Sequence, residues 1–334
     1  MVQVLQQRFA SMRLGGGGRG FTQEGLPSPL TPDRGKTVEG KSVQDPKDFL
    51  IPSVDNRWGA WAQGNGVFGR SYNIADVPNN RFASGGFLAG LDYAFNEHFI
   101  VGAFAGYEGN YTKYVNGGRM DVNTVNFGIY TTYLAGNGFF ANHILGGGAS
   151  SYSVKRPIEF GTIDRSAYSD PSGANFTTSL DLGYDIKLGN FTITPTLSGQ
   201  YTYVGIGAFT ENGADSLDLR VEQQNANSLR TSLGGRVAYT WKASRKITVI
   251  PQASMLWQHE FLQNSRNIES SLDGGAGSNF DYLTTVPSRD AVYAGVGVTV
   301  QIGDRWNFNT NWNIDFGRTD YISNMVSGGL NVSF

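Results

Sequence analysis

The chain has 334 residues, 45 of them glycine, with 13% aromatic residues, 16% charged residues and a formal net charge of −2. This balance gives no reason to expect a nucleic-acid partner, and the lack of cysteine excludes disulfides and thiolate metal sites. No apolar run approaches the roughly 18 residues of a transmembrane helix. A barrel strand shows only half of its residues to lipid, which is compatible with the mean hydropathy of −0.28.

Residues 1–14 predict a short helix. Leu5, Phe9 and Met12 recur at near-helical spacing, and a run of glycines from Gly15 ends the pattern. The residues alone leave two interpretations open, a frayed terminal arm or a helix threaded through a barrel lumen. Gln and Arg interrupt the apolar residues, so this segment is not a secretory signal, and we expect a signal upstream or already removed.

Residues 15–56 predict a linker, because four consecutive glycines are followed by scattered prolines among polar residues. From Arg57 to Phe334 the chain instead cycles between alternating runs and two kinds of connection. The short connections are 95–98, 135–138, 188–190, 242–245 and 303–305, and the long polar ones are about 70–80, 112–118, 154–174, 208–227, 262–288 and 318–323. Short and long connections alternate strictly, which predicts about twelve strands with both ends on the short-turn side.

The stretch 305–318 shows the alternation most clearly. Trp306, Phe308 and Trp312 fall on one face, whereas Asn307 and Asn309 fall on the other. Other strands repeat this pattern, with an apolar face too large and a polar face too charged for a dry soluble core. We therefore expect an all-β fold, an antiparallel transmembrane β-barrel whose lumen is wet. The charged residues expected to face the lumen are Asp92, Asp181, Asp185, Lys187, Arg230 and Arg236.

A barrel must close, because unpaired backbone groups in hydrocarbon cost several kcal/mol each. About twelve strands enclose more space than the filled eight-stranded barrels and less than the channel of a porin. A helix about 10–12 Å wide fits such a lumen, which gives residues 1–14 a place. Arg8 and Arg13 of that helix are then candidates to pair with the lumen carboxylates.

The ordered set of strand sequences resembles a known family, the β-domain of classical autotransporters, the type V secretion proteins of Gram-negative bacteria. The matching stretches are Arg57-Trp-Gly-Ala-Trp-Ala-Gln-Gly64, Gly86-Phe-Leu-Ala-Gly-Leu-Asp-Tyr93, Phe99-Ile-Val-Gly102 and Gly328-Gly-Leu-Asn-Val-Ser-Phe334. The resemblance covers about 57–334, and the preceding helix and linker also follow the family order.

The resemblance implies a twelve-stranded outer-membrane translocator that carries or anchors an N-terminal passenger at the cell surface, with a helix left in the pore. The partners it implies are outer-membrane lipid, the barrel-assembly machinery and a covalently attached passenger that this chain does not contain. The last strand, with Leu330, Val332 and the terminal Phe334, resembles the signal that the assembly machinery reads. Residues 2–14 lack the Asn pair at which some members cleave themselves, so self-cleavage by that mechanism is not expected.

Two other functions compete with translocation. A passive channel or small porin would place the N-terminal segment outside the lumen. A rim hydrolase would use His259 near the outer end of a strand, but the adjacent Glu260 faces the opposite way in a strand and would not cooperate with it. We expect a monomer with no catalytic activity, no cofactor and no metal.

Overall fold

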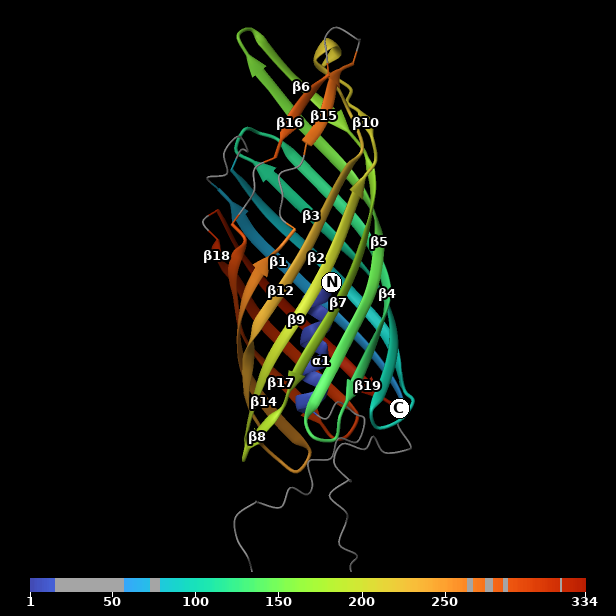
Figure 1. The fold of residues 1–334 in the computed structure, drawn as a ribbon, viewed down its shortest axis with the longest axis vertical. Coiled ribbons are helices and arrows are strands. Elements are labelled where there is room, and N and C mark those ends of the chain that lie inside the picture. Colours follow the sequence, from blue (N-terminus) through green and yellow to red (C-terminus); the bar gives the residue numbers. More distant parts are fainter. Residues whose placement is uncertain (16–56, 73–78, 263–266, 274–278, 285–287, 319) are drawn as a thin grey trace, which may run out of the picture.

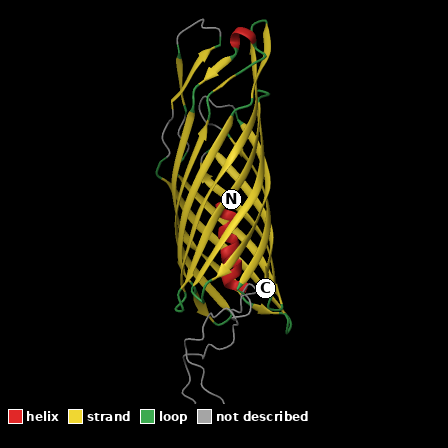
Figure 2. Ribbon diagram, turned by 90° about the vertical axis from the view of Figure 1, so that its right-hand side faces the viewer, coloured by secondary structure: helices red, strands yellow, loops and turns green. Residues whose placement is uncertain are grey.

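The computed structural model describes residues 1–15, 57–72, 79–262, 267–273, 279–284, 288–318 and 320–334. A helix, α1, runs from Val2 to Gly15 and lies inside a tall barrel of strands (Figures 1 and 2). The predicted linker, residues 15–56, lies almost entirely outside the described residues. None of the helices in the described ranges is both long enough and apolar enough to cross a membrane.

Among the described residues, twelve long strands form the barrel and pair antiparallel with their neighbours along the chain. Their bounds are β1 Trp58–Ser71, β2 Asn80–Ala94, β3 Phe99–Tyr114, β4 Arg119–Leu134, β5 Phe139–Phe160, β7 Ser172–Tyr184, β9 Phe191–Ile206, β12 Gln224–Tyr239, β14 Ile247–Glu260, β17 Asp290–Ile302, β18 Trp306–Arg318 and β19 Tyr321–Ser333. The barrel closes where β1 pairs with β19, for example at Ala62 and Leu330. Closure removes the free sheet edges that hydrocarbon does not tolerate.

The faces of the barrel follow the alternation of the sequence. On β18, Trp306 and Phe308 are 45% and 42% exposed on the outside, whereas Asn307 and Asn309 are 0% and 5% exposed in the lumen. Opposite this asparagine stripe, β17 has Gly295 and Gly297, where an added Cβ would lie about 2 Å from the amide oxygens of Asn313 and Asn311. The predicted transmembrane barrel with an apolar outside and a polar inside is confirmed.

The strand that begins at Phe139 was ambiguous in sequence, because two phenylalanines are adjacent. Phe139 lies on the outer face and Phe140 is buried in the lumen, so the alternation continues through the pair. The three glycines that follow are also part of β5. Two short strands, β8 (Ile186–Leu188) and β13 (Trp241–Lys242), extend the wall at the short-turn end.

The structure differs from the expected polar loops at the other end. Over 154–174, β5 continues to Phe160 and turns into β6 (Ile163–Ser169), which pairs with it as a projecting hairpin (Figure 1). Over 208–227 and 262–288, short strands form a separate four-stranded sheet in the order β10 (Phe209–Thr210), β11 (Leu219–Val221), β15 (Asn267–Leu272) and β16 (Phe280–Leu283). The outer end of the barrel is therefore more structured than the sequence predicts.

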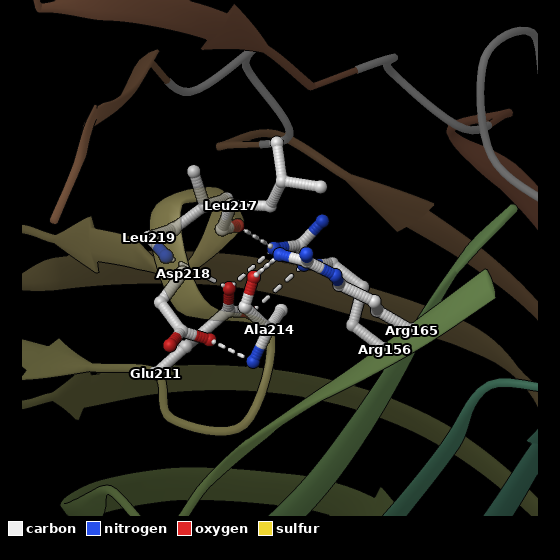
Figure 3. A network of polar contacts seen from close by, with 7 residues as sticks. All are labelled: Arg156, Arg165, Glu211, Ala214, Leu217, Asp218 and Leu219. Atoms are coloured by element: carbon white, nitrogen blue, oxygen red, sulfur yellow. Dashed lines mark hydrogen bonds and ion pairs between the residues drawn. The ribbon is translucent and has the colours of Figure 1, made fainter. Parts of the chain in front are cut away.

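A polar network joins the projecting hairpin to the segment between β10 and β11 (Figure 3). Arg156 donates from Nε to Glu211 at 2.9 Å and from Nη2 to the carbonyl of Leu217 at 3.0 Å. Arg165 donates to the carbonyl of Ala214 at 2.9 Å, just before the 3-10 helix η1 (Asp215–Leu217). Ile158, Ala167 and Ala214 pack beside these contacts as a small apolar cluster. Residues from two connections thus form one unit outside the barrel.

Candidate functional site: the lumen helix and its wall

Helix α1 is buried along its length by the barrel wall. Leu5, Phe9 and Met12 lie in an apolar cluster with side chains from several strands, which are Trp61, Leu88, Phe104, Tyr130, Ile144 and Met325. Its 14 residues span about 21 Å. Apolar and polar residues of α1 are both buried, because the lumen wall surrounds the helix on all sides. A helix of mixed character is therefore accommodated without an exposed polar face.

Arg8 makes the most enclosed polar contacts of the helix. Its guanidinium forms an ion pair with Asp92 of β2, whose side chain is 0% exposed, and Nε donates to Asn331 of β19 at 3.1 Å. The Arg8 guanidinium carbon lies 4.7 Å from the ring centroid of Trp61 and 5.2 Å from that of Tyr130. An arginine between two rings and a carboxylate gains both cation–π and charge-assisted hydrogen-bond energy.

The barrel itself holds this arginine site in place. Trp61 donates from Nε1 to the Tyr130 hydroxyl at 2.9 Å, and that hydroxyl donates to Asp92 at 2.6 Å. Glycines leave room behind both rings, because a Cβ at Gly90 would lie 2.7 Å from Trp61 and one at Gly102 would lie 2.2 Å from Tyr130. The contacts among Trp61, Tyr130 and Asp92 do not involve the helix, so the site is organised by the wall.

The other polar residues of α1 contact other sides of the lumen. Gln6 donates to Asp181 of β7 at 2.7 Å, and Ser327 of β19 donates to the side-chain oxygen of Gln7 at 2.5 Å. Nε of Arg13 lies 3.4 Å from Oδ2 of Asp185, and its guanidinium carbon lies 3.4 Å from the ring centroid of Phe140. The helix is therefore joined to opposite parts of the barrel rather than to one wall.

The remaining charged residues that the sequence singled out lie on β12 and β8. Arg230 is on the lumen side of β12, where its Nε lies 3.6 Å from Glu260. Arg236 is partly buried on the same strand and lies near Arg13, Asp181 and Asp185. Lys187 of β8 is paired with Thr192, which faces the lumen. It lies at the short-turn end of the barrel and is exposed there. Only three of the six charged lumen residues, Asp92, Asp181 and Asp185, contact the helix through interactions described above.

Two lumen cavities lie next to the N-terminal end of α1. They have volumes of about 290 and 340 Å³, and Met1, Val2 and Glu108 line both of them. Arg230, Asp315 and Arg318 line the first cavity. The helix thus fills the part of the lumen nearer the short turns and leaves space beyond its first residue.

The C-terminal residues close the barrel at the short-turn end. Leu330 and Val332 are partly exposed on the outer face of β19. Phe334 is 55% exposed, and its backbone exchanges hydrogen bonds of 3.0 and 3.1 Å with Trp58 of the first strand. The side chain of Phe334 is therefore exposed on the outer face, while its backbone pairs with the first strand where the barrel closes.

His259, at the outer end of β14, and the adjacent Glu260 contact different residues. His259 lies 2.9 Å from Asp290 on the next strand, whereas Glu260 points inward and accepts hydrogen bonds from Ser228 and from the backbone of Leu229. The adjacent residues face opposite ways, as the strand period requires.

Sequence reasoning missed three wall residues of the arginine site, namely Trp61, Tyr130 and Asn331. One signal was available for Trp61: it stands three residues after Trp58, so the two tryptophans of one strand must face opposite sides. A large aromatic on the polar face of a barrel strand indicates contact with something inside the lumen.

The closed barrel, its apolar outside and its helix-filled lumen define an integral outer-membrane barrel with an internal plug. A family model, the autotransporter beta-domain, matches residues 60–313. The chain belongs to this family. Members are outer-membrane translocators of Gram-negative bacteria, and this chain is such a translocator barrel.

Individual relatives are distant. The protein YaiT of Escherichia coli K12 is 26% identical over 277 residues, covering 75% of this chain and 26% of YaiT. Esterase EstA of Pseudomonas aeruginosa is 23% identical over 253 residues, covering 73% of this chain and 38% of EstA. The chain thus spans well under half the length of these relatives. The translocator domain of the autotransporter NalP from Neisseria meningitidis has a similar fold, with a TM-score of 0.64, 16% identity and coverage of 98% and 96% of the two chains.

Proposed function

We propose that α1 is the tether through which this barrel anchors a passenger at the cell surface. The observation that supports this is the ion pair of Arg8 with Asp92, enclosed by Trp61 and Tyr130. Withdrawal of the helix separates Arg8 from Asp92 and from both rings, so the charge-assisted hydrogen bond and the cation–π contacts oppose it at this point. A polypeptide that is covalently joined to α1 is then held in the pore.

The residues of α1 have separate roles in this proposal. Leu5, Phe9 and Met12 fill the lumen, Arg8 docks in the arginine site, and Arg13 joins the end of the helix nearest the short turns to Asp185. Arg230 lines the cavity beyond the helix and interacts there with a passing chain or with ions, whereas Arg236 lies near Arg13 and its carboxylate neighbours. YaiT and EstA each have a region outside the matched part, and we infer that the passenger corresponds to such a region.

Single-channel conductance tests the tether. The full chain and a variant that lacks residues 1–15 are compared in planar bilayers at the same salt concentration. We expect low conductance for the full chain and a large, stable increase for the deletion variant. Equal conductance of the two proteins would favour a passive channel whose N-terminal segment lies outside the lumen.

We also propose that the barrel carries no hydrolytic activity of its own, since His259 and Glu260 face different sides. EstA is named an esterase, but the matched region is 38% of that protein. Assay of the purified chain against ester, peptide and acyl-lipid substrates tests the proposal. Any activity that His259→Ala abolishes while the barrel stays folded would contradict it.

The proposed partners follow from the same assignment. Lipid surrounds the apolar face, the barrel-assembly machinery reads the C-terminal strand through Leu330, Val332 and Phe334, and one barrel acts alone as a monomer. Light scattering of the purified chain, corrected for detergent, is expected to give the mass of one copy. A stable dimer would overturn the last point.

A further inference from the structure

Five basic side chains form a continuous row across the outer ends of five neighbouring strands. Arg70 of β1 is paired in register with Arg81 of β2, and Arg81 is paired with Lys113 of β3. Lys113 is paired with Arg119 of β4, which is paired in turn with Lys155 of β5. Directly opposed residues share one face of a sheet, with Cβ atoms about 5 Å apart. We call these five residues the cationic row.

The cationic row faces outward, not into the lumen. Along each strand every second residue shares a face, so Arg70 lies on the side of Phe68, Arg81 on the side of Phe87, and Lys113 on the side of Tyr111. These aromatic residues are large and exposed on the outer surface of the barrel. Four cations of the row are exposed and Lys155 is half-buried.

The cationic row begins at the polar boundary of the membrane. Trp58 marks the aromatic girdle at the short-turn end, and Arg70 follows it twelve positions later on the same strand. At about 3.3 Å per residue and a tilt near 40°, this distance corresponds to about 30 Å along the barrel axis. The apolar band of an outer-membrane barrel is about 25 Å tall, so Arg70 lies just beyond the outer edge of that band. The row rises from Arg70 toward Lys155, which lies sixteen positions after Phe139 at the short-turn end of β5.

An open cavity lies beside three residues of the cationic row. It has a volume of about 850 Å³, and Arg70, Arg81 and Lys113 line it together with Tyr72 and Val115. No Asp or Glu is present among the described residues that line this cavity. Within the row, Arg119 has a carboxylate neighbour, Asp121, at 3.2 Å. Like charges placed directly opposite each other destabilise a sheet, so a bound anion would relieve this arrangement.

The other side of the barrel lacks this feature. Strands β7, β9, β14 and β17 contain no lysine or arginine within their bounds. Both arginines of β12, Arg230 and Arg236, are on the lumen side, as their buried neighbour Ser232 is. Among the described barrel strands, the outward-facing cations at the outer end are therefore concentrated on β1 to β5, as expected for a binding site.

We propose that the cationic row binds the phosphorylated headgroups of anionic lipid in the outer leaflet. Arginine and lysine are the side chains that pair with phosphate oxygens, and several cations beside a membrane add their attraction to anionic lipid. A lipid with two phosphates fits a row of cations better than a lipid with one. The acyl chains would lie on the apolar face below, next to Phe68 and Tyr111.

Native mass spectrometry of the full chain in detergent tests the site, with diphosphoryl lipid A, monophosphoryl lipid A and phosphatidylcholine as probes. The test variant is Arg70→Gln, Arg81→Gln, Lys113→Gln. Its matched control is Lys242→Gln, Arg245→Gln, Lys246→Gln, which removes three exposed cations at the short-turn end. A third variant, Arg70→Lys, Arg81→Lys, keeps the charge. Heat-modifiable electrophoretic mobility reports whether each barrel is folded.

We expect diphosphoryl lipid A to bind more tightly than the monophosphoryl form, and phosphatidylcholine to bind least. The affinity for diphosphoryl lipid A should fall about fivefold for each cation removed, or on the order of a hundredfold for the test variant. The lysine variant and the short-turn control should keep most of the affinity. Equal losses in test and control variants would overturn the site, and full displacement by millimolar inorganic phosphate would overturn its assignment to lipid.

Discussion

Tyr130 lies so close to Gly102 on the neighbouring strand that a Cβ at Gly102 would be 2.2 Å from its ring. The absence of a side chain at Gly102 therefore allows the tyrosine ring to occupy its position. The ring in turn positions Asp92 for the helix, because the Tyr130 hydroxyl donates to that carboxylate at 2.6 Å. A glycine of the barrel wall thus helps to set the position of the arginine site.

Gly102→Ala should displace Tyr130 and destabilise the folded barrel by about 1–3 kcal/mol, the usual cost of overpacking. The midpoint of urea unfolding, followed by tryptophan fluorescence in detergent, measures the change. Gly199→Ala is the matched control, because a Cβ at this strand glycine meets no atom within 4 Å. Equal shifts for the two variants would mean that the close approach of Tyr130 carries no special cost.

Arg8→Gln should loosen the helix without unfolding the barrel. It leaves Asp92 buried without its cation, which costs about 3–5 kcal/mol and outweighs any hydrogen bond that glutamine regains. We expect bursts of high conductance in single-channel recordings of this variant, from transient withdrawal of α1. Gln3→Ala is the control, because Gln3 lines the cavity at the free end of the helix. Persistent low conductance of Arg8→Gln would show that the remaining contacts of α1 hold the helix without the Arg8 ion pair.

The strand faces and the even strand number were predictable because the bilayer imposes a strict rule on every residue within it. Trp306 and Asn307 illustrate this rule: one must meet lipid and the other must meet water, so the period of two is visible in the sequence. The same rule predicted that Asp92 and Asp181 face inward. Local alternation is sufficient for such predictions because each depends on a residue and its own strand.

The alternation predicted that Arg8 and Arg13 would meet lumen carboxylates, but not which carboxylate each arginine contacts. Arg8 and Asp92 are 84 positions apart, and no local pattern connects them. The outer hairpin was missed for a different reason. Beyond the membrane, a strand no longer needs an apolar side, so Val154 to Phe160 pair with β6 without the alternation that marks a membrane strand. Backbone pairing continues where the side-chain signal has ended.

Arg156→Gln should loosen the outer unit and leave the barrel intact. Arg156 bridges Glu211 and the carbonyl of Leu217. Because its side chain is about one-third exposed and water screens the charges, these hydrogen bonds stabilise the outer unit by about 1 kcal/mol. Proteolysis between β10 and β11 should then become about fivefold faster. Arg220→Gln, which removes a more exposed arginine nearby, should have little effect. Equal acceleration in both variants would contradict a specific role for Arg156.

Removal of the Phe334 side chain distinguishes recognition from stability at the end of the chain. Deletion would also remove the two backbone hydrogen bonds with Trp58, so the variant is Phe334→Ala, which keeps them. The side chain is 55% exposed, so its loss removes little packing, and refolding of the purified variant into detergent should be nearly unchanged. In cells, Phe334→Ala should fail to reach the outer membrane in normal amount, because the variant lacks the terminal aromatic side chain that the assembly machinery is proposed to read. Phe99→Ala serves as the control, since Phe99 is 38% exposed and lies at the same end of the barrel. If both variants are inserted in normal amount, Phe334 is not part of an assembly signal, and if both refold poorly in detergent, its role is structural.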